Sequence, residues 1–398
     1  MKIRLNKTMV AVATSALLLV SVPVAGITAA ANATAKPTYT IGYQGPLSGG
    51  NAQLGLNMEY GVQLAIQQAN ASGKYKFKLR FQTLDDQGDP TVAPGVAQGA
   101  VANTNLVAIV GPSFSGATAA SMPYYGPANI AMVSASATRT SLTDSTANPN
   151  NNTFFRVVAD DSVQGPADAK YLVTTKKIKK LYVVDDGSSY GQGVASQVST
   201  SATALGATVT TASVPGTTQC QAGTGSTSEY SAAATTVVGS HATGLFYGGY
   251  YCDLGLFLGA LKTAGYHGLI MSDDGALSNS LISGTTPRSA ANNVLISCAC
   301  ATSTNAAFNT AYDNLAGFPA TNATYAAEAY DAANAIIKAM SQLTTISRGG
   351  IVAKLKSSGF SFKGITKTIK FQHNGNISGS AIYVSKVVNG VIKQLGLE

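Results

Sequence analysis

Residues 111–143 read GPSFSGATAASMPYYGPANIAMVSASATRTSLT, and this stretch decides the fold class. An uncharged apolar run at residues 106–110 precedes it and predicts a short buried strand, and a second such run follows at residues 130–133. Each run ends in small, hydroxyl-bearing residues. Such loops at the carboxyl ends of parallel strands bind small anions through free backbone N–H groups. The stretch therefore predicts an α/β sheet with a binding site along one edge.

Strand and helix patterns alternate on both sides of this stretch. Strands are expected at residues 39–42, 77–84, 181–184, 208–214, 245–249, 269–272, 294–297, 381–388 and 391–395, and a hairpin around 364–375. Helices are expected at residues 57–69, 92–103, 164–174, 194–205, 254–264 and 325–343. This order predicts two doubly wound, Rossmann-like α/β lobes, with a ligand cleft where the strand ends of both lobes face each other.

The composition is that of a packed globular protein. The chain has 398 residues, of which 45% are hydrophobic and only 11% are charged, enough for two domains. The net charge is +8, but the basic residues are scattered, and the densest group, at residues 176–180, has no interleaved aromatic residue. We therefore expect no nucleic-acid partner. No dinucleotide or phosphate-binding glycine fingerprint occurs and no residues have metal-ligand spacing, so neither cofactor nor metal is expected.

The first 35 residues have the pattern of a secretory signal peptide. Lys2, Arg4 and Lys7 are followed by an apolar stretch at residues 9–27 and by small-residue cleavage sites near residues 31–35. No cysteine follows the apolar stretch, so a lipid anchor is not expected. No later run approaches the ~20 apolar residues of a membrane span. The mature chain is thus expected to be exported and to act in the periplasm or outside the cell.

The four cysteines suggest disulfides, because an exported chain reaches an oxidising compartment. Cys220 lies in a loop rich in Gly, Thr and Ser, and Cys252 follows a predicted strand, so we favour a Cys220–Cys252 bridge. Cys298 and Cys300 then pair or stay reduced. A zinc site built from all four cysteines is the alternative, although the spacing has no C-x2-C pair.

Two groups of residues at predicted strand ends have complementary chemistry. Ser115, Ser136 and Thr138, with nearby N–H groups, suit a carboxylate. In the second lobe, an acid and two tyrosines suit an ammonium group, through charge and cation–π contact. These are Tyr190, Tyr250 and Asp274. Together the two groups predict a receptor for a zwitterion.

A catalytic alternative depends on residues 187–191, GSSYG, which match G-x-S-x-G after a strand. A serine hydrolase with Ser189 as nucleophile needs a histidine, and His373 comes in the right chain order. However, His373 lies in the segment Gln-His-Asn-Gly, which is a turn signal. We therefore expect a binding protein and not an enzyme.

These residues carry a family resemblance that covers nearly the whole mature chain. The motifs that carry it are residues 41–49, 85–90, 110–116, 133–138, 162–166, 190–193, 247–250, 271–275 and 330–333. In this order the chain resembles the type I periplasmic substrate-binding proteins, in particular the leucine/isoleucine/valine-binding branch that delivers amino acids to ABC importers. The resemblance implies two lobes joined by three crossovers that close on the ligand like a hinge.

The resemblance also implies lobe boundaries and partners. The N-terminal lobe would comprise residues 36–158 plus 303–376, and the C-terminal lobe residues 159–302 plus 377–398. The protein would act as a monomer, bind an amino acid or amino-acid-like ligand, possibly a branched-chain one, and deliver it to ABC permease subunits in the membrane. The alternative is a ligand-sensing, receptor-type domain that signals to a partner protein.

The resemblance finally assigns roles to single residues. Ser115 and Thr138 would bind the ligand carboxylate, while the position of Ser136 would offer a backbone carbonyl to the ammonium group, and Ala137 between them is also expected at the ligand. Tyr190 and Tyr250 would form walls of the pocket. The chain departs from the family's pattern at two positions. Asp274, opposite the ammonium group, stands where amino-acid binders of the family commonly have Glu, and Leu54 stands where an aromatic residue often lines the side-chain pocket.

Overall fold

A computed structural model describes residues 35–214, 220, 227–379 and 381–397. The first part of the chain forms a five-stranded parallel sheet in the order β2-β1-β3-β4-β5. Its strands are β1 (Thr38–Gly45), β2 (Lys78–Asp85), β3 (Leu106–Val110), β4 (Ala131–Ser134) and β5 (Phe154–Arg156). β3 and β4 are fully buried, as their apolar runs predict.

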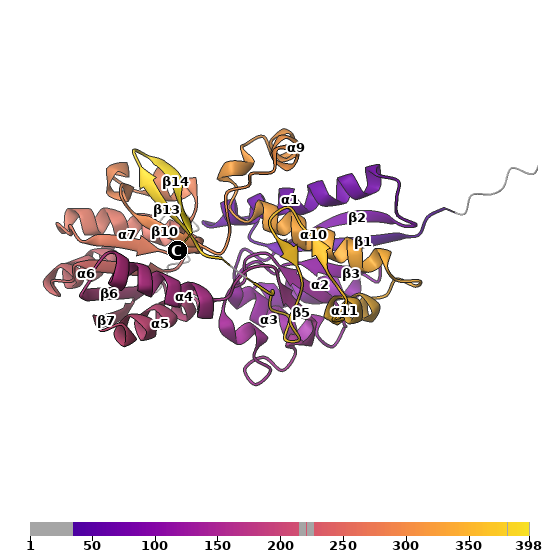
Figure 1. The fold of residues 1–398 in the computed structure, drawn as a ribbon, viewed down its shortest axis with the longest axis horizontal. Helices are drawn as coiled ribbons and strands as arrows, with labels where there is room; N and C mark the ends of the chain where they lie inside the picture. The colour runs from indigo at the N-terminus through magenta and orange to yellow at the C-terminus, as the bar shows by residue number, and fades with distance from the viewer. Residues whose placement is uncertain (1–34, 215–219, 221–226, 380, 398) are drawn as a thin grey trace, which may run out of the picture. The chain divides into compact units, whose positions relative to one another are not determined.

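Helices from two distant parts of the chain pack with this sheet. The early helices are α1 (Ala52–Ala71), α2 (Ala93–Ala102) and α3 (Ser115–Tyr125), and the late ones are α10 (Ala326–Ser341) and α11 (Arg348–Lys356). α10 packs along α1 and contacts β3 and β4 (Figure 1). α10 is rich in buried alanines, and these small side chains let it approach its neighbours closely. The N-terminal lobe is thus completed by residues that follow most of the second lobe in sequence.

The second sheet has seven strands in the order β14-β13-β10-β9-β8-β6-β7. Its strands are β6 (Lys180–Asp185), β7 (Thr208–Ser213), β8 (Gly244–Gly248), β9 (Leu269–Ser272), β10 (Leu295–Cys298), β13 (Tyr383–Val388) and β14 (Val391–Leu397). Strands β6 to β10 pair in parallel, and β13 and β14 add two antiparallel strands at the edge next to β10. The fold is the type I periplasmic binding protein fold, as the sequence predicts.

The connections of the second sheet are mostly helical. They are α4 (Asp161–Lys170), which continues as a π-helical turn η3 (Tyr171–Thr175), α5 (Ser189–Ala204), α6 (Thr227–Gly239), α7 (Tyr251–Thr263), α8 (Asn279–Gly284) and α9 (Ala306–Ala316). Single-turn η4 (Asp274–Ala276) follows β9, and a small hairpin pairs β11 (Phe362–Lys363) with β12 (Thr368–Ile369). None of the described helices is long and apolar enough to span a membrane.

The cysteines form two disulfides. Cys220 is bridged to Cys252, as favoured from the sequence, with Cα atoms 5.9 Å apart, and Cys298 is bridged to Cys300. The alternative of a four-cysteine zinc site is therefore wrong, because a disulfide sulfur is not a thiolate ligand. The predicted signal peptide, up to residue 34, and most of the Gly/Thr/Ser-rich loop at residues 215–226 lie outside the described residues.

Candidate functional site

A narrow pocket lies where residues of both lobes meet. The N-terminal lobe and the helix α10 that completes it contribute Leu54, Met58, Phe114, Ser115, Ser136 and Tyr325, and the C-terminal lobe contributes Tyr190, Tyr250, Asp274 and Gly275. The pocket encloses about 270 Å³ of space between atoms. At its core there is room for a group about the size of one water molecule. Six of the eight residues that the sequence proposes as ligand contacts are among these ten.

The serines of the N-terminal lobe are held by the loops that follow β3 and β4. Ser115 is the first residue of α3, so its backbone N–H lies at the helix N-terminus, and its Oγ accepts a hydrogen bond from the N–H of Arg139 at 3.2 Å. Ser136 Oγ donates to the carbonyl of Ser113 at 2.7 Å. The hydroxyl proton of Ser136 is therefore engaged within the lobe, while the helix N-terminus at Ser115 retains donors for an anion.

The other two proposed residues, Ala137 and Thr138, do not line the pocket. Both are fully buried behind it. The Ala137 N–H donates to Ser134 Oγ, and the Thr138 carbonyl accepts from the N–H of Asp161. The hydroxyl of Thr138 is buried and lies beside the Asp161 carboxylate, where it opposes the rise in the pKa of that group. Thr138 thus acts behind the lining of the pocket and does not belong to it.

Asp274 is the carboxylate of the pocket, and its position is fixed by a tyrosine. The Tyr190 hydroxyl donates to Asp274 Oδ1 at 2.8 Å and accepts from the N–H of Gly275 at 3.1 Å. Burial raises the pKa of Asp274, and the hydroxyls of Tyr325 and Tyr190 oppose that shift. A cation in the pocket would favour the ionised form for the same electrostatic reason.

Further carboxylates surround Asp274 in the interior. Burial raises the pKa of Asp161 to about 7, and the negative charge of Asp274 adds to that shift. Both carboxylate oxygens of Asp161 are buried, and the Thr138 hydroxyl opposes the rise in its pKa. Burial and the neighbouring Asp274 also raise the pKa of Asp273, which accepts a hydrogen bond from the Gly249 N–H. These buried carboxyl groups lie behind Asp274, which is the acid that lines the pocket itself.

The aromatic wall comes from both lobes. The Phe114 ring stacks on the Tyr250 ring with centroids 4.1 Å apart and planes 21° apart, and the Tyr250 ring lies 5.2 Å from that of Tyr190. The Asp186 carboxylate at the end of β6 orients this wall, because it accepts the N–H groups of Ser188 and of Tyr250. One buried acid thus ties together the ends of β6 and β8, from which both tyrosines project.

A polar contact also joins the lobes beside the pocket. The Arg139 guanidinium donates to the backbone carbonyl and, at 3.2 Å, to Oγ of Ser189 at the start of α5. Ser188 caps this helix by accepting the N–H of Gly191. The proposed nucleophile Ser189 therefore contacts an arginine, and His373 lies exposed in its predicted turn. The GSSYG segment serves as a helix start, not as a nucleophile elbow.

Sequence reasoning missed four of the pocket residues: Met58, Phe114, Gly275 and Tyr325. Phe114 lies directly before Ser115, and its place in the deciding stretch was the available signal. Tyr325 precedes α10 with φ of 65°, a left-handed conformation that is unusual for a residue other than glycine. Its buried hydroxyl lies beside the Asp274 carboxylate and opposes the rise in the pKa of that group. That left-handed turn places the Tyr325 ring in the pocket, and the local sequence pattern does not predict the turn.

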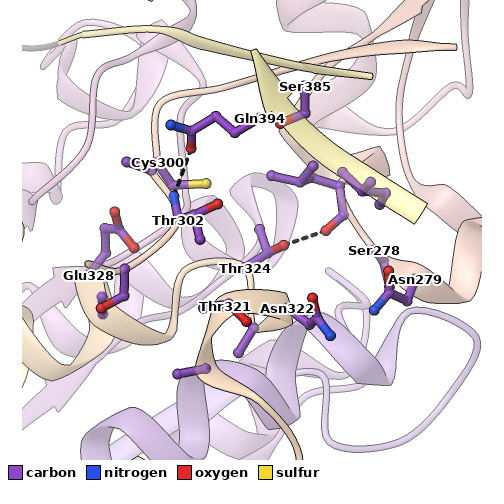
Figure 2. Close-up of a pocket in the computed structure, with 17 residues that line it drawn as sticks. Ser278, Asn279, Cys300, Thr302, Thr321, Asn322, Thr324, Glu328, Ser385 and Gln394 are labelled. Carbon is purple, nitrogen blue, oxygen red and sulfur yellow. Dashed lines mark hydrogen bonds between the residues drawn. The ribbon is translucent and has the colours of Figure 1, made fainter. Parts of the chain in front are cut away.

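A second cavity lies where chain segments cross between the lobes (Figure 2). Its lining is mostly polar: the Thr302 N–H donates to Gln394 Oε1 at 2.8 Å, and Thr324 Oγ1 donates to the Leu277 carbonyl. Glu328 lines it from the first turn of α10 and is 2% exposed. Burial raises the pKa of Glu328 to about 7, an effect that Lys367 opposes. The crossing region therefore contains an acid that titrates near neutral pH.

No group of three or more His, Cys, Asp or Glu side chains in the described part of the chain is arranged to hold a metal ion. Serines, tyrosines and Asp274 supply the polar groups that line the pocket.

Comparisons with known proteins agree with this architecture. The amino acid binding protein of Pseudomonas aeruginosa is 28% identical over 242 residues, which are 61% of this chain and 62% of that protein. The leucine-, isoleucine-, valine-, threonine- and alanine-binding protein of the same organism is 27% identical over 259 residues, 65% of each chain. The matches thus span less than two thirds of the length of these curated relatives.

Solved structures extend the likeness to the whole described fold. The leucine binding protein LivK of Thermotoga maritima superposes with a TM-score of 0.80 and 22% identity over 90% of this chain and 98% of its own. The branched-chain amino acid transporter substrate binding protein LivJ of Streptococcus pneumoniae, in complex with isoleucine, superposes with a TM-score of 0.78 and 25% identity. The match covers 91% of this chain and 99% of that protein. The profile of the family described as periplasmic binding protein matches residues 38–391. This chain belongs to the periplasmic binding protein family, a family of binding proteins and not of enzymes.

Proposed function

We propose that this protein captures an amino acid or amino-acid-like zwitterion in the pocket between its lobes, outside the cytoplasmic membrane. One observation carries the proposal. The N-terminus of α3 at Ser115, from one lobe, and the carboxylate of Asp274, from the other, line the same narrow pocket. Aligned N–H donors stabilise a carboxylate, and a carboxylate beside tyrosine rings stabilises an ammonium group. A ligand with both charges would bridge the lobes.

The transport role follows from relatives. The names of similar proteins include amino acid binding and branched-chain amino acid transporter substrate binding. We propose accordingly that the loaded protein delivers its ligand to the membrane subunits of an ABC importer, and that residues 36–158 plus 303–376 and 159–302 plus 377–398 act as the two moving lobes. Family membership supports export to the periplasm.

The proposal is tested by calorimetry and thermal melting on refolded, ligand-free protein. A ligand at ~100 times its dissociation constant stabilises a fold by about 2.7 kcal/mol, which gives a measurable rise in Tm. We expect a zwitterionic amino acid to raise Tm and the matching plain acid and plain amine to have much smaller effects. If neutral amides or plain acids stabilise the protein and zwitterions do not, the proposal is wrong.

A variant separates the site from the rest of the protein. Asp274→Asn keeps the shape of the side chain and removes its charge, so affinity for the zwitterion should fall at least ~10-fold. The matched control is Asp144→Asn, because Asp144 is exposed and bonds only within its own turn, to the Thr146 N–H. Equal affinities of the two variants would contradict the role of Asp274.

A further inference from the structure

The apolar side of the pocket is already filled by the protein's own side chains. Leu54 and Met58 of α1 are 2% and 1% exposed, and Phe114 is 6% exposed. The Met58 sulfur lies 3.3 Å from Ser136 Oγ and so packs against the loop after β4. The side-chain compartment of a bound amino acid would have to lie among these residues, since Ser115 and Asp274 mark the polar end.

Phe114 occupies the centre of that compartment and has little freedom to leave it. On one side its ring stacks on Tyr250 at 4.1 Å. On the other side it lies against Gly88, where an added Cβ would come within 2.5 Å of the ring. Gly88 has φ of 71°, so the polar loop after β2 turns in the left-handed conformation that glycine favours and brings its backbone onto the ring. The ring is thus confined by Tyr250 on one face and by Gly88 at its Cδ2–Cε2 edge.

This arrangement limits the size of the ligand. We propose that Phe114 is a specificity-determining residue that excludes long and branched side chains, so that the ligand is a zwitterionic amino acid with a short side chain, of the size of alanine or serine. The inference rests on the function proposed above. The whole pocket, polar end included, has free room for only about one water molecule, so any bound amino acid has to move its walls apart, and a methyl or hydroxymethyl side chain requires a smaller movement than an isobutyl group.

The expected discrimination is large. A methylene group that a pocket accommodates or rejects changes binding by roughly 10–200-fold. Alanine or serine should therefore bind at least ~100-fold more tightly than leucine or isoleucine, which exceed them by several carbon atoms. Phenylalanine should bind no better than leucine, because the ring of Phe114 already covers the face of Tyr250.

The test is isothermal calorimetry on refolded, ligand-free protein with glycine, alanine, serine, valine, leucine and phenylalanine as probes. Phe114→Ala should raise affinity for leucine at least ~10-fold and leave that for alanine equal or weaker. Phe114→Leu gives an intermediate pocket and serves if the alanine variant does not fold. The matched control is Phe318→Ala, which removes a ring of equal size that packs on Tyr60 and Tyr312 outside the pocket; it should leave the order of affinities unchanged.

The outcomes distinguish the two proposals. If the wild-type protein binds leucine or isoleucine as tightly as alanine, the role of Phe114 is wrong and the zwitterion function stands. The role of Phe114 is likewise wrong if Phe114→Ala and Phe318→Ala change leucine binding equally. If no amino acid binds, the proposed function fails and this inference fails with it.

Discussion

Replacing Arg156 with methionine should destabilise the protein strongly, because this arginine is the buried hub beneath the binding loops. Arg156 is fully buried and donates five hydrogen bonds. The acceptors are Asn376 Oδ1, the carbonyls of Ala137 and Arg139, Thr143 Oγ1 and Asp160 Oδ2. One side chain thus holds the segment after β4, the start of α4 and a late crossover segment.

The magnitude follows from what the substitution leaves behind. Arg156 and Asp160 form an ion pair at 3.2 Å, with both side chains buried. Burial lowers the pKa of Arg156 to about 10, so it remains charged at neutral pH. Removing one partner of a buried pair costs about 3–5 kcal/mol, because the other charge is left without compensation. At about 2 °C per kcal/mol for a chain of this size, we expect Tm to fall by about 6–10 °C.

The assay is thermal and urea unfolding, with Arg348→Met as the matched control. Arg348 also donates to three backbone carbonyls, those of Leu106, Val101 and Asn103, but it is only half-buried and forms no ion pair with a carboxylate in the described part of the chain. Its loss should cost about 1–2 kcal/mol. If Arg156→Met destabilises the protein no more than Arg348→Met, the hub does not have the energetic role derived from its contacts.

Three further perturbations have defined outcomes. The folded-state pKa values of Asp161 and Glu328, both about 7, lie above that of an unfolded carboxyl group, so the folded chain binds more protons and stability should fall as pH rises from about 4 to 7. Tm should thus be several degrees higher at pH 5 than at pH 8, whereas a Tm that rises with pH would contradict the assignment. The Cys220–Cys252 bridge spans a 32-residue separation, so its reduction should lower the free energy of unfolding by about 3–4 kcal/mol, measured in urea. A double serine variant whose urea unfolding curve matches that of the wild type would refute this. Gly193→Val would place a Cβ atom within 2.8 Å of the Asp161 carboxylate, so ligand affinity measured by calorimetry should fall at least ~10-fold. A normal affinity would show that the close approach of Gly193 to Asp161 is not needed for the bound state.

The sequence predicted the elements that depend on local pattern. The uncharged run at residues 106–110 became β3 with its predicted bounds, and the small-residue loops after β3 and β4 do lie at the pocket. The apolar spacing at residues 164–174 predicted a helix, and Asp160 caps α4 there by accepting the Ser162 N–H. Periodicity and capping are short-range signals that survive in the fold.

The features that the sequence did not predict depend on contacts between distant segments. Phe114 is a pocket residue only because Tyr250, from the other lobe, meets its ring. The sequence predicts no bounds for a helix between residues 103 and 164, yet α3 begins at Ser115 and continues through Pro123. Arg156 had no recognisable motif, since its partners lie up to 220 residues away. Side-chain packing of this kind overrides local propensity and leaves little trace in one sequence.

The strand order of the second sheet has a consequence for how the chain acquires its structure. β10 pairs with β13, and β13 pairs with the terminal β14, so the edge of that sheet closes only when the last residues are in place. The N-terminal lobe is likewise incomplete without α10 and α11, which pack on β3 and β4. Each lobe is therefore completed only by a segment that lies far away in the sequence, and its folding depends on long-range pairings, which form slowly because they close large loops.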